Sequence, residues 1–124
     1  MITPGATFTS RLLITARDTA QDMGSGDMPV LATPRMVALM ENAAMKAVAP
    51  SLDPGLTTVG GEIKVKHLAP SPIGAVVEAT ALLVAVDGRK LTFHVSACQS
   101  GELIGEGEHT RFVVNREKFL SKLK

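Results

Sequence analysis

The sequence contains few aromatic residues and little net charge. Its 124 residues include four Phe and neither Trp nor Tyr, and 13 Lys and Arg against 12 Asp and Glu leave a formal net charge of +1. Nucleic-acid-binding domains usually carry a basic face, and RNA-binding modules stack bases on exposed aromatic rings. Both features are missing, so we expect no nucleic-acid partner.

Cysteine and long apolar runs are also scarce. Cys98 is the single cysteine, so no intramolecular disulfide can form, and its strand-like surroundings indicate a small, partly buried side chain. The first 18 residues lack the cationic start and long apolar run of a signal peptide, and no apolar stretch reaches the roughly 20 residues of a membrane helix. We therefore expect a cytoplasmic protein that does not bind membranes.

The chain does have enough aliphatic side chains to build one core. A length of 124 residues suits one ordinary domain, and we treat residues 1–124 as a single domain. A domain of this size buries roughly two-thirds of the surface of its unfolded chain. With so few aromatic rings, the core must consist mainly of Ala, Val, Leu, Ile and Met.

The order of the predicted elements indicates an α+β domain. A strand, a polar glycine-rich loop and one long helix precede four consecutive strands, with turns at Asp87-Gly88 and Ser100-Gly101. A basic tail should form a short helix that docks through Phe119 and Leu123. This order predicts a five-stranded antiparallel sheet that covers a single helix. The predicted segments are strand 6–16, loop 17–32, helix 33–49, strands 57–68, 75–86, 90–99 and 102–115, and the tail 116–124.

The beginning of the long helix is marked by Thr33 and Pro34. Thr is a favourable N-cap residue, and Pro is preorganised for the first helical turn. A helix start also presents free N–H groups and a partial positive charge, which suit a developing oxyanion. Thr33 is therefore either a cap or a residue placed beside chemistry.

Glu41 lies on the apolar side of the predicted helix. Arg35, Asn42 and Lys46 form a narrow solvent-facing strip, and Glu41 falls about 100° from the nearest of them. An ionised carboxylate away from water costs several kcal/mol unless it is paired, hydrogen-bonded or protonated. Glu41 is therefore either a structural carboxylate with a bonding partner or part of a functional site.

His67 extends from the apolar face of its strand. Within residues 62–67, Ile63 and Val65 share a face with His67, and the three charged residues between them share the other face. A single histidine in this position is commonly a bonded core residue. Together with Glu41, however, it makes a pair of titratable groups that both turn away from solvent, and we predict that the two meet in one cavity.

The other histidines carry weaker signals. His94 shares a strand face with Thr92, Ser96 and Cys98, and we interpret it as exposed. His109 and Arg111 alternate in phase within "GEHTRF". An arginine on a strand is commonly a solvated charge or one half of an ion pair.

Several motifs together resemble one family. A Thr begins an apolar helix, a Glu follows eight positions later in "ALMENAA", and "VKHLAP" follows a Gly-Gly strand. With "VDGRKLTFHVSA", "GEGEHTRFVV" and "EKF", these residues resemble the fluoroacetyl-CoA thioesterase-like family of hot-dog proteins over residues 31–119. The resemblance implies a hot-dog fold, with one long helix wrapped by a curved five-stranded antiparallel sheet. It also implies a homodimer with acyl-thioester sites near the interface.

The resemblance further implies roles for particular residues. Thr33, Glu41 and His67 match the catalytic set, Gly60 matches a glycine that lines the acyl site, and Arg111 matches an arginine close to the acyl pocket. The family's namesake carries an aromatic-rich lid that recognises fluorine, whereas residues 16–32 of the present chain contain no aromatic residue. We therefore predict hydrolysis of a short- or medium-chain acyl-CoA, without assigning fluoroacetyl-CoA selectivity.

Thioester hydrolysis needs an activated nucleophile and an oxyanion site more than acid assistance, because the leaving thiol has a pKa near 8.5. Glu41 could activate water or Thr33, or attack the carbonyl itself, while His67 relays protons. The oxyanion donors would be backbone N–H groups at the helix start or at Gly60 and Gly61. We expect no metal and no cofactor, since the coenzyme A thioester is the substrate.

Three alternatives remain open from the sequence. The first is a non-catalytic dimer that binds acyl thioesters or other apolar small molecules. The second, an enoyl-thioester hydratase, needs an Asp close to its catalytic His, and no Asp is adjacent to His67. The third, a small α+β ligand-binding cone, usually has more than one helix before its sheet and would be monomeric.

Overall fold

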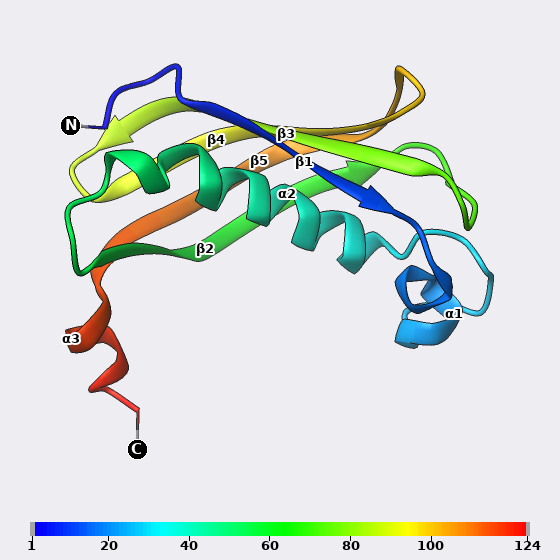
Figure 1. Cartoon of the computed structure of the whole chain (residues 1–124), viewed down its shortest axis with the longest axis horizontal. Coiled ribbons are helices and arrows are strands. Elements are labelled where there is room, and N and C mark those ends of the chain that lie inside the picture. The colour runs from blue at the N-terminus through cyan, green and yellow to red at the C-terminus, as the bar shows by residue number, and fades with distance from the viewer. Residues whose placement is uncertain (1, 124) are drawn as a thin grey trace.

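Five antiparallel strands form one sheet that curves around a single long helix (Figure 1). The structure is a computed structural model, and it describes residues 2–123. The strand order is β1-β3-β4-β5-β2, so β1 and β2 are the two edges of the sheet. The elements are β1 (Thr7–Leu13), the 3-10 turn η1 (Ala16–Asp18), α1 (Ala20–Met23), α2 (Thr33–Val48), η2 (Ala49–Ser51), β2 (Leu56–His67), β3 (Val76–Asp87), β4 (Lys90–Gln99), β5 (Glu102–Asn115) and α3 (Arg116–Leu120).

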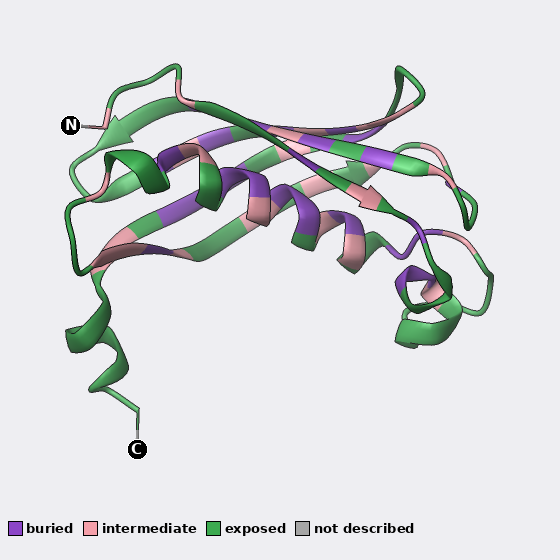
Figure 2. Cartoon of the chain, in the orientation of Figure 1, coloured by how far each residue is buried: buried purple, intermediate pink, exposed green. Residues whose placement is uncertain are grey.

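The core lies between α2 and the concave face of the sheet. Met36, Met40 and Val48 of the helix are fully buried, and Figure 2 shows the buried residues along the side of α2 that faces the strands. On the sheet, Phe93 and Leu83 are equally buried. The predicted aliphatic core is confirmed, as is the hot-dog arrangement of one long helix held by a five-stranded antiparallel sheet.

The turns follow the sequence closely, with one correction. Ser100 and Gly101 both adopt positive φ, 50° and 78°, as the predicted two-residue hairpin requires. The other hairpin lies one residue later than predicted, because Asp87 still pairs with Lys90 and only Gly88 and its successor form the loop. Gly88 has φ 60°, a value that glycine adopts without strain.

Residues 17–32 are more ordered than the predicted loop. Asp18 is buried, and its carboxylate accepts a hydrogen bond from Arg35 Nε of α2 at 2.9 Å. The Asp18 backbone oxygen also accepts from Ala32 N–H, and the Thr19 hydroxyl caps α1 by accepting from Asp22 N–H. Short polar contacts of this kind fix a segment that has no hydrophobic periodicity, so the sequence pattern did not reveal them.

Helix α3 projects from the end of β5 (Figure 1), and Phe119 and Leu123 are 40% and 75% exposed. The predicted docking of this helix through Phe119 and Leu123 is therefore not made within residues 2–123. None of the helices within residues 2–123 has the length and apolarity needed to span a membrane.

Candidate active site

The first residue of α2 contacts the last residue of β2. Thr33 Oγ1 lies 2.7 Å from His67 Nδ1, which is a hydrogen bond between residues 34 positions apart. The prediction that Thr33 caps the helix is wrong. Ala32 occupies the N-cap position and no side chain caps this helix, because the Thr33 hydroxyl is engaged by the imidazole. Pro34, in the first turn, fits the helix start as expected.

His67 is half-buried, in accordance with its predicted place on the apolar face of β2. Burial lowers the pKa of His67, and the nearby backbone of Ala69 only partly offsets this effect. The second ring nitrogen, Nε2, is buried and has no hydrogen-bond partner within the described chain. A buried polar atom without a partner is costly, so this nitrogen is available to a further hydrogen-bonding group.

A cavity of about 420 Å³ opens beside the Thr33–His67 pair. Its walls come from three places: the segment around α1, the start of α2, and the residues that follow β2. The walls are mostly aliphatic, with two hydroxyl groups and one imidazole as their side-chain polar groups. The lining residues are Ala20, Ser25, Gly26, Met28, Val30, Leu31, Thr33, Pro34, His67, Leu68, Ala69 and Pro70.

Glu41 turns toward the sheet, but it joins a different cluster. It is partly buried, and its Oε2 lies 3.3 Å from the place that a Cβ on Gly60 would occupy. His109 Cε1 and Arg111 Nη1 lie 3.3 Å and 3.5 Å from the same point. Gly60 has no side chain, and these three groups converge on the space that it leaves open.

Arg111 and His109 are buried, at 7% and 1% exposure, so the interpretation of Arg111 as a solvated charge is wrong. Arg111 Nε donates to Thr58 Oγ1 at 2.8 Å, and Nη2 donates to the Thr58 carbonyl at 3.0 Å. Nη1 lies 3.1 Å from His109 Nε2. Burial lowers the pKa of Arg111, while the charge of Glu41 raises it.

The sequence did contain a signal for this cluster. Gly105, Gly107, His109 and Arg111 alternate along β5, and the glutamates between the first three are exposed. The alternating face must therefore point inward, and Gly105 does so directly, since a Cβ there would lie 2.6 Å from Met36 S. If Glu106 and Glu108 are taken to mark the outer face of β5, the residues that alternate with them, including His109 and Arg111, must lie in the interior. The charge of Arg111 alone suggested the opposite.

Gly61 plays a separate part in the geometry of β2. Gly60 pairs with Arg111 and Glu62 pairs with Thr110, so Gly61 is the extra residue of a β-bulge. Bulges bend a strand and leave one residue outside the regular ladder, and they are frequent beside active sites. The bulge lies at the point where Glu41 approaches β2.

The predicted set thus falls into two clusters within one chain. Thr33 and His67 form the first, and Glu41 with Gly60 and Arg111 forms the second. No hydrogen bond links Glu41 to His67 within residues 2–123, so the expected direct meeting of these two side chains is absent. Eight helical positions separate Thr33 from Glu41, which corresponds to a rise of about 12 Å along the axis.

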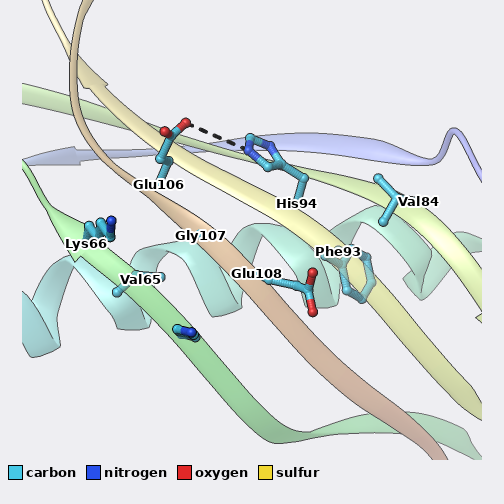
Figure 3. Close-up of a pocket in the computed structure, with 9 residues that line it drawn as sticks. Val65, Lys66, Val84, Phe93, His94, Glu106, Gly107 and Glu108 are labelled. Carbon is cyan, nitrogen blue, oxygen red and sulfur yellow. Dashed lines mark ion pairs between the residues drawn. The ribbon is translucent and has the colours of Figure 1, made fainter.

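The outer face of the sheet carries another hollow, of about 660 Å³ (Figure 3). At its edge, His94 Nε2 of β4 lies 3.9 Å from Glu106 Oε2 of β5, and His94 is exposed as predicted. Lys64, Lys66 and Glu108 also line it. None of the predicted site residues reaches this hollow, so it is not the candidate active site.

Comparisons with known proteins agree with this geometry. The family model described as fluoroacetyl-CoA-specific thioesterase matches residues 14–117. A fluoroacetyl-CoA thioesterase from Streptantibioticus cattleyicolor is 45% identical over 95 residues, which cover 77% of this chain and 68% of that protein. A solved structure of the fluoroacetyl-CoA thioesterase FlK superposes with a TM-score of 0.91 at 38% identity, covering 98% of this chain and 95% of the other.

A thioesterase superfamily member from Thermus thermophilus has a TM-score of 0.90 at 28% identity, covering 98% of this chain and 90% of that one. The family match spans most of the chain, and it includes both clusters described above. The chain therefore belongs to the fluoroacetyl-CoA-specific thioesterase family and is a thioester hydrolase.

Proposed function

We propose that this protein hydrolyses short- or medium-chain acyl-CoA thioesters with Thr33, Glu41 and His67 as its catalytic groups, in a homodimer whose sites each use both subunits. The observation that carries the proposal is the 2.7 Å contact between Thr33 Oγ1 and His67 Nδ1 at the edge of a mostly aliphatic cavity. A hydroxyl within hydrogen-bond reach of an imidazole is the usual arrangement of an activated nucleophile and its base.

The second subunit supplies what one chain lacks. Strand β2 is an open edge of the sheet, with the Glu41–Gly60 cluster near its beginning and His67 at its end. If β2 pairs antiparallel with its own copy around a two-fold axis near Ile63, His67 comes to lie beside the partner's Gly60. The partner's Glu41 then approaches the unpaired Nε2 of His67.

The chemistry follows from this arrangement. His67 Nε2–H would donate to the partner's Glu41, which leaves Nδ1 free to take a proton from the nucleophile. That nucleophile is the Thr33 hydroxyl or a water bound to it. The carboxylate stabilises the imidazolium that forms, and the coenzyme A thiolate leaves without strong acid assistance. Burial within one subunit lowers the pKa of His67, whereas the partner's Glu41 would raise it; burial thus favours the neutral imidazole that can accept a proton, and the carboxylate favours the imidazolium that forms.

The substrate class rests on the cavity and on the relatives. The relatives at 45% and 38% identity are named for fluoroacetyl-CoA. A solved variant of FlK holds fluoroacetate and coenzyme A, at 38% identity and a TM-score of 0.86. In the present chain the segment above the cavity contributes Met28, Val30 and Leu31 and no aromatic ring. An aliphatic wall favours a plain acyl chain through dispersion and burial of apolar surface.

Steady-state hydrolysis of a series of acyl-CoAs tests the activity. We expect turnover of acyl groups from acetyl to octanoyl, and a loss of at least roughly 100-fold in kcat/KM for Glu41→Gln and for His67→Ala. If both variants keep the wild-type kcat/KM, these two side chains are structural. Tight binding of acyl-CoA without turnover would instead favour a non-catalytic binding protein.

Mixing two inactive variants tests the shared site. In a heterodimer of Thr33→Val and Glu41→Gln, one site carries both changes and the other carries neither. Half of the dimers in an equal mixture are heterodimers, so we expect about one-quarter of wild-type activity to return after subunit exchange. If all three residues act within one subunit, no activity returns. A chain that stays monomeric contradicts the shared site directly.

A further inference from the structure

We propose that His109 is a positioning residue for this reaction: as a neutral hydrogen-bond acceptor it fixes the guanidinium of Arg111, and Arg111 in turn holds the carboxylate of Glu41 in place. This inference rests on the proposed role of Glu41 and assigns a function to a buried histidine that the catalytic scheme does not use.

The partners of His109 settle its protonation. Nδ1 lies 2.7 Å from the Glu62 carbonyl oxygen, which can only accept, so Nδ1 carries the proton. Nε2 lies 3.1 Å from Arg111 Nη1, which can only donate, so Nε2 must be the acceptor. One nitrogen donates and the other accepts, and this pattern is possible only for the neutral ring.

Arg111 depends on that acceptor for its orientation. The two bonds to Thr58 hold one edge of the guanidinium, through Nε and Nη2, against β2. The bond to His109 holds the remaining nitrogen, Nη1, which is also the atom of Arg111 that approaches the Gly60 position. Because all three nitrogens of the planar guanidinium are hydrogen-bonded, the group cannot rotate. Its charge therefore faces Glu41 in a single fixed orientation.

Glu41, His109 and Arg111 lie close together around Gly60. A Cβ on Gly60 would lie within 3.5 Å of Glu41, His109 and Arg111 together. The Phe93 ring covers His109 from β4, with ring centroids 6.3 Å apart. With one acceptor lost, Arg111 would retain a buried donor without a partner, and its simplest remedy would be a direct bond to Glu41. That bond would pull the carboxylate away from the reacting groups.

Protonation of His109 would have the same effect as removing its acceptor. The charged groups that face the ring are Arg111 from β5 and Glu41 from α2, with the uncharged Phe93 and the Glu62 carbonyl on the other sides. Burial lowers the pKa of His109; the bond to Glu62 and the charge of Glu41 raise it, and Arg111 lowers it further. The net lowering keeps the ring neutral at neutral pH.

The test compares two substitutions of similar length. In His109→Gln, the amide can donate to the Glu62 carbonyl and accept from Arg111, whereas His109→Met fills similar space without a comparable acceptor. We expect Met to lower kcat by roughly tenfold or more with KM changed less than about threefold, and Gln to restore most of that loss. If His109 only fills space, the order is reversed, because an apolar side chain against Phe93 is then the better replacement.

Two further measurements keep the inference separate from the proposed function. In an Arg111→Met background, the change from His109 to Met should have little additional effect, because the two residues act through one contact. In the wild-type protein, ¹⁵N NMR should show Nε2 of His109 unprotonated at every pH at which the enzyme is fully active. Full additivity of the two substitutions, or a protonated Nε2, overturns the positioning role. Wild-type activity of Glu41→Gln overturns the proposed function instead.

Discussion

Thr33 Oγ1 and His67 Nδ1 lie 2.7 Å apart although no hydrophobic pattern in the sequence connects them. The fold brings them together, because the first turn of α2 and the end of β2 lie at the same end of the molecule (Figure 1). The hydroxyl that would ordinarily cap the helix is turned to the imidazole, and the N-cap position is left to Ala32. At this position the hydroxyl bonds the imidazole and caps no helix N–H, as the proposed pair of nucleophile and base requires.

This relationship predicts that Thr33→Val lowers activity strongly and changes stability very little. Valine keeps the shape but removes the hydroxyl, so kcat/KM should fall by roughly 100-fold, because the proton path through His67 is lost. The free energy of unfolding should change by less than about 0.5 kcal/mol, whereas loss of a true N-cap costs about 1 kcal/mol.

Acyl-CoA hydrolysis and urea denaturation measure these two quantities. Thr33→Ser is the matched control, since it keeps the hydroxyl and should keep activity within about fivefold of the wild type. A clear loss of stability in Thr33→Val with little loss of activity would restore the capping role and contradict the catalytic one.

Much of the fold could be predicted from the sequence. The period of two in the strands, the apolar helix between Thr33 and Pro50, and the turn residues Ser100 and Gly101 are local signals. Each appears in the structure within a residue or two, except that β1 ends at Leu13, three residues before its predicted end at residue 16. The inward direction of Glu41 and His67 followed from the same periodicities. Local geometry decides such features, so a single sequence suffices for them.

The grouping of the site residues could not be predicted in this way. Periodicity shows that Glu41 and His67 both turn inward, but it does not show that about half of the helix separates their contacts. Nor does periodicity identify the partners of Arg111, because two of the three acceptors that make burial of its charge tolerable belong to Thr58 on β2, 53 positions away. Such partners are set by strand register and are not local in the sequence.

The two neighbouring glycines of β2 should respond differently to alanine. A Cβ at position 60 would meet Glu41, His109 and Arg111 within 3.5 Å, so Gly60→Ala displaces the carboxylate by a few tenths of an ångström. Since small displacements of catalytic groups are costly, we expect kcat/KM to fall by roughly 10- to 100-fold with a modest loss of stability.

Gly61→Ala provides the comparison. Its Cβ would lie 2.5 Å from the Phe112 ring, which is 39% exposed and able to move outward. We expect kcat/KM within about fivefold of the wild type and a loss of stability of about 1 kcal/mol, measured by urea denaturation. Equal loss of activity in both variants would show that the bulge itself matters, and not the space that Gly60 leaves open.

The lowered pKa of His67 predicts a particular dependence on pH. Burial disfavours the charged imidazole, so the folded protein binds its proton only below the ordinary pKa of about 6.5. Since the unfolded chain binds the proton first, the free energy of unfolding should be unaffected above about pH 6.5 and should decrease below it.

An NMR titration of the His67 ring measures the pKa directly, and urea denaturation at several pH values measures its consequence for stability. A titration midpoint above 6.5 would contradict the burial argument and show that a carboxylate close to the ring outweighs burial. In His67→Gln the decrease in stability below pH 6.5 should be smaller than in the wild type, because one of the buried histidines no longer contributes.

The contact between Asp18 and Arg35 should stabilise the segment above the cavity in a pH-dependent way. Burial alone would raise the pKa of Asp18, but hydrogen bonds from Thr15 and Arg35 outweigh it and hold the pKa below 3.8. A carboxyl with a lowered folded pKa contributes stability that is complete above its unfolded pKa and disappears as the pH falls through the folded value. Asp18→Asn should therefore cost about 1–2 kcal/mol at pH 7, and the difference from the wild type should shrink as the pH falls below the ordinary aspartate pKa of about 3.8.

Glu78→Gln is the control for this experiment, because it removes the pair between Arg11 and Glu78, whose side chains are 69% and 50% exposed. An exposed pair contributes little, so this variant should lose less than about 0.5 kcal/mol at pH 7. Urea denaturation between pH 7 and pH 3 separates the two cases. If Asp18→Asn is no less stable than Glu78→Gln at pH 7, the segment is held by its backbone bonds alone, and the approach of Met28 and Val30 to the cavity does not depend on the ion pair.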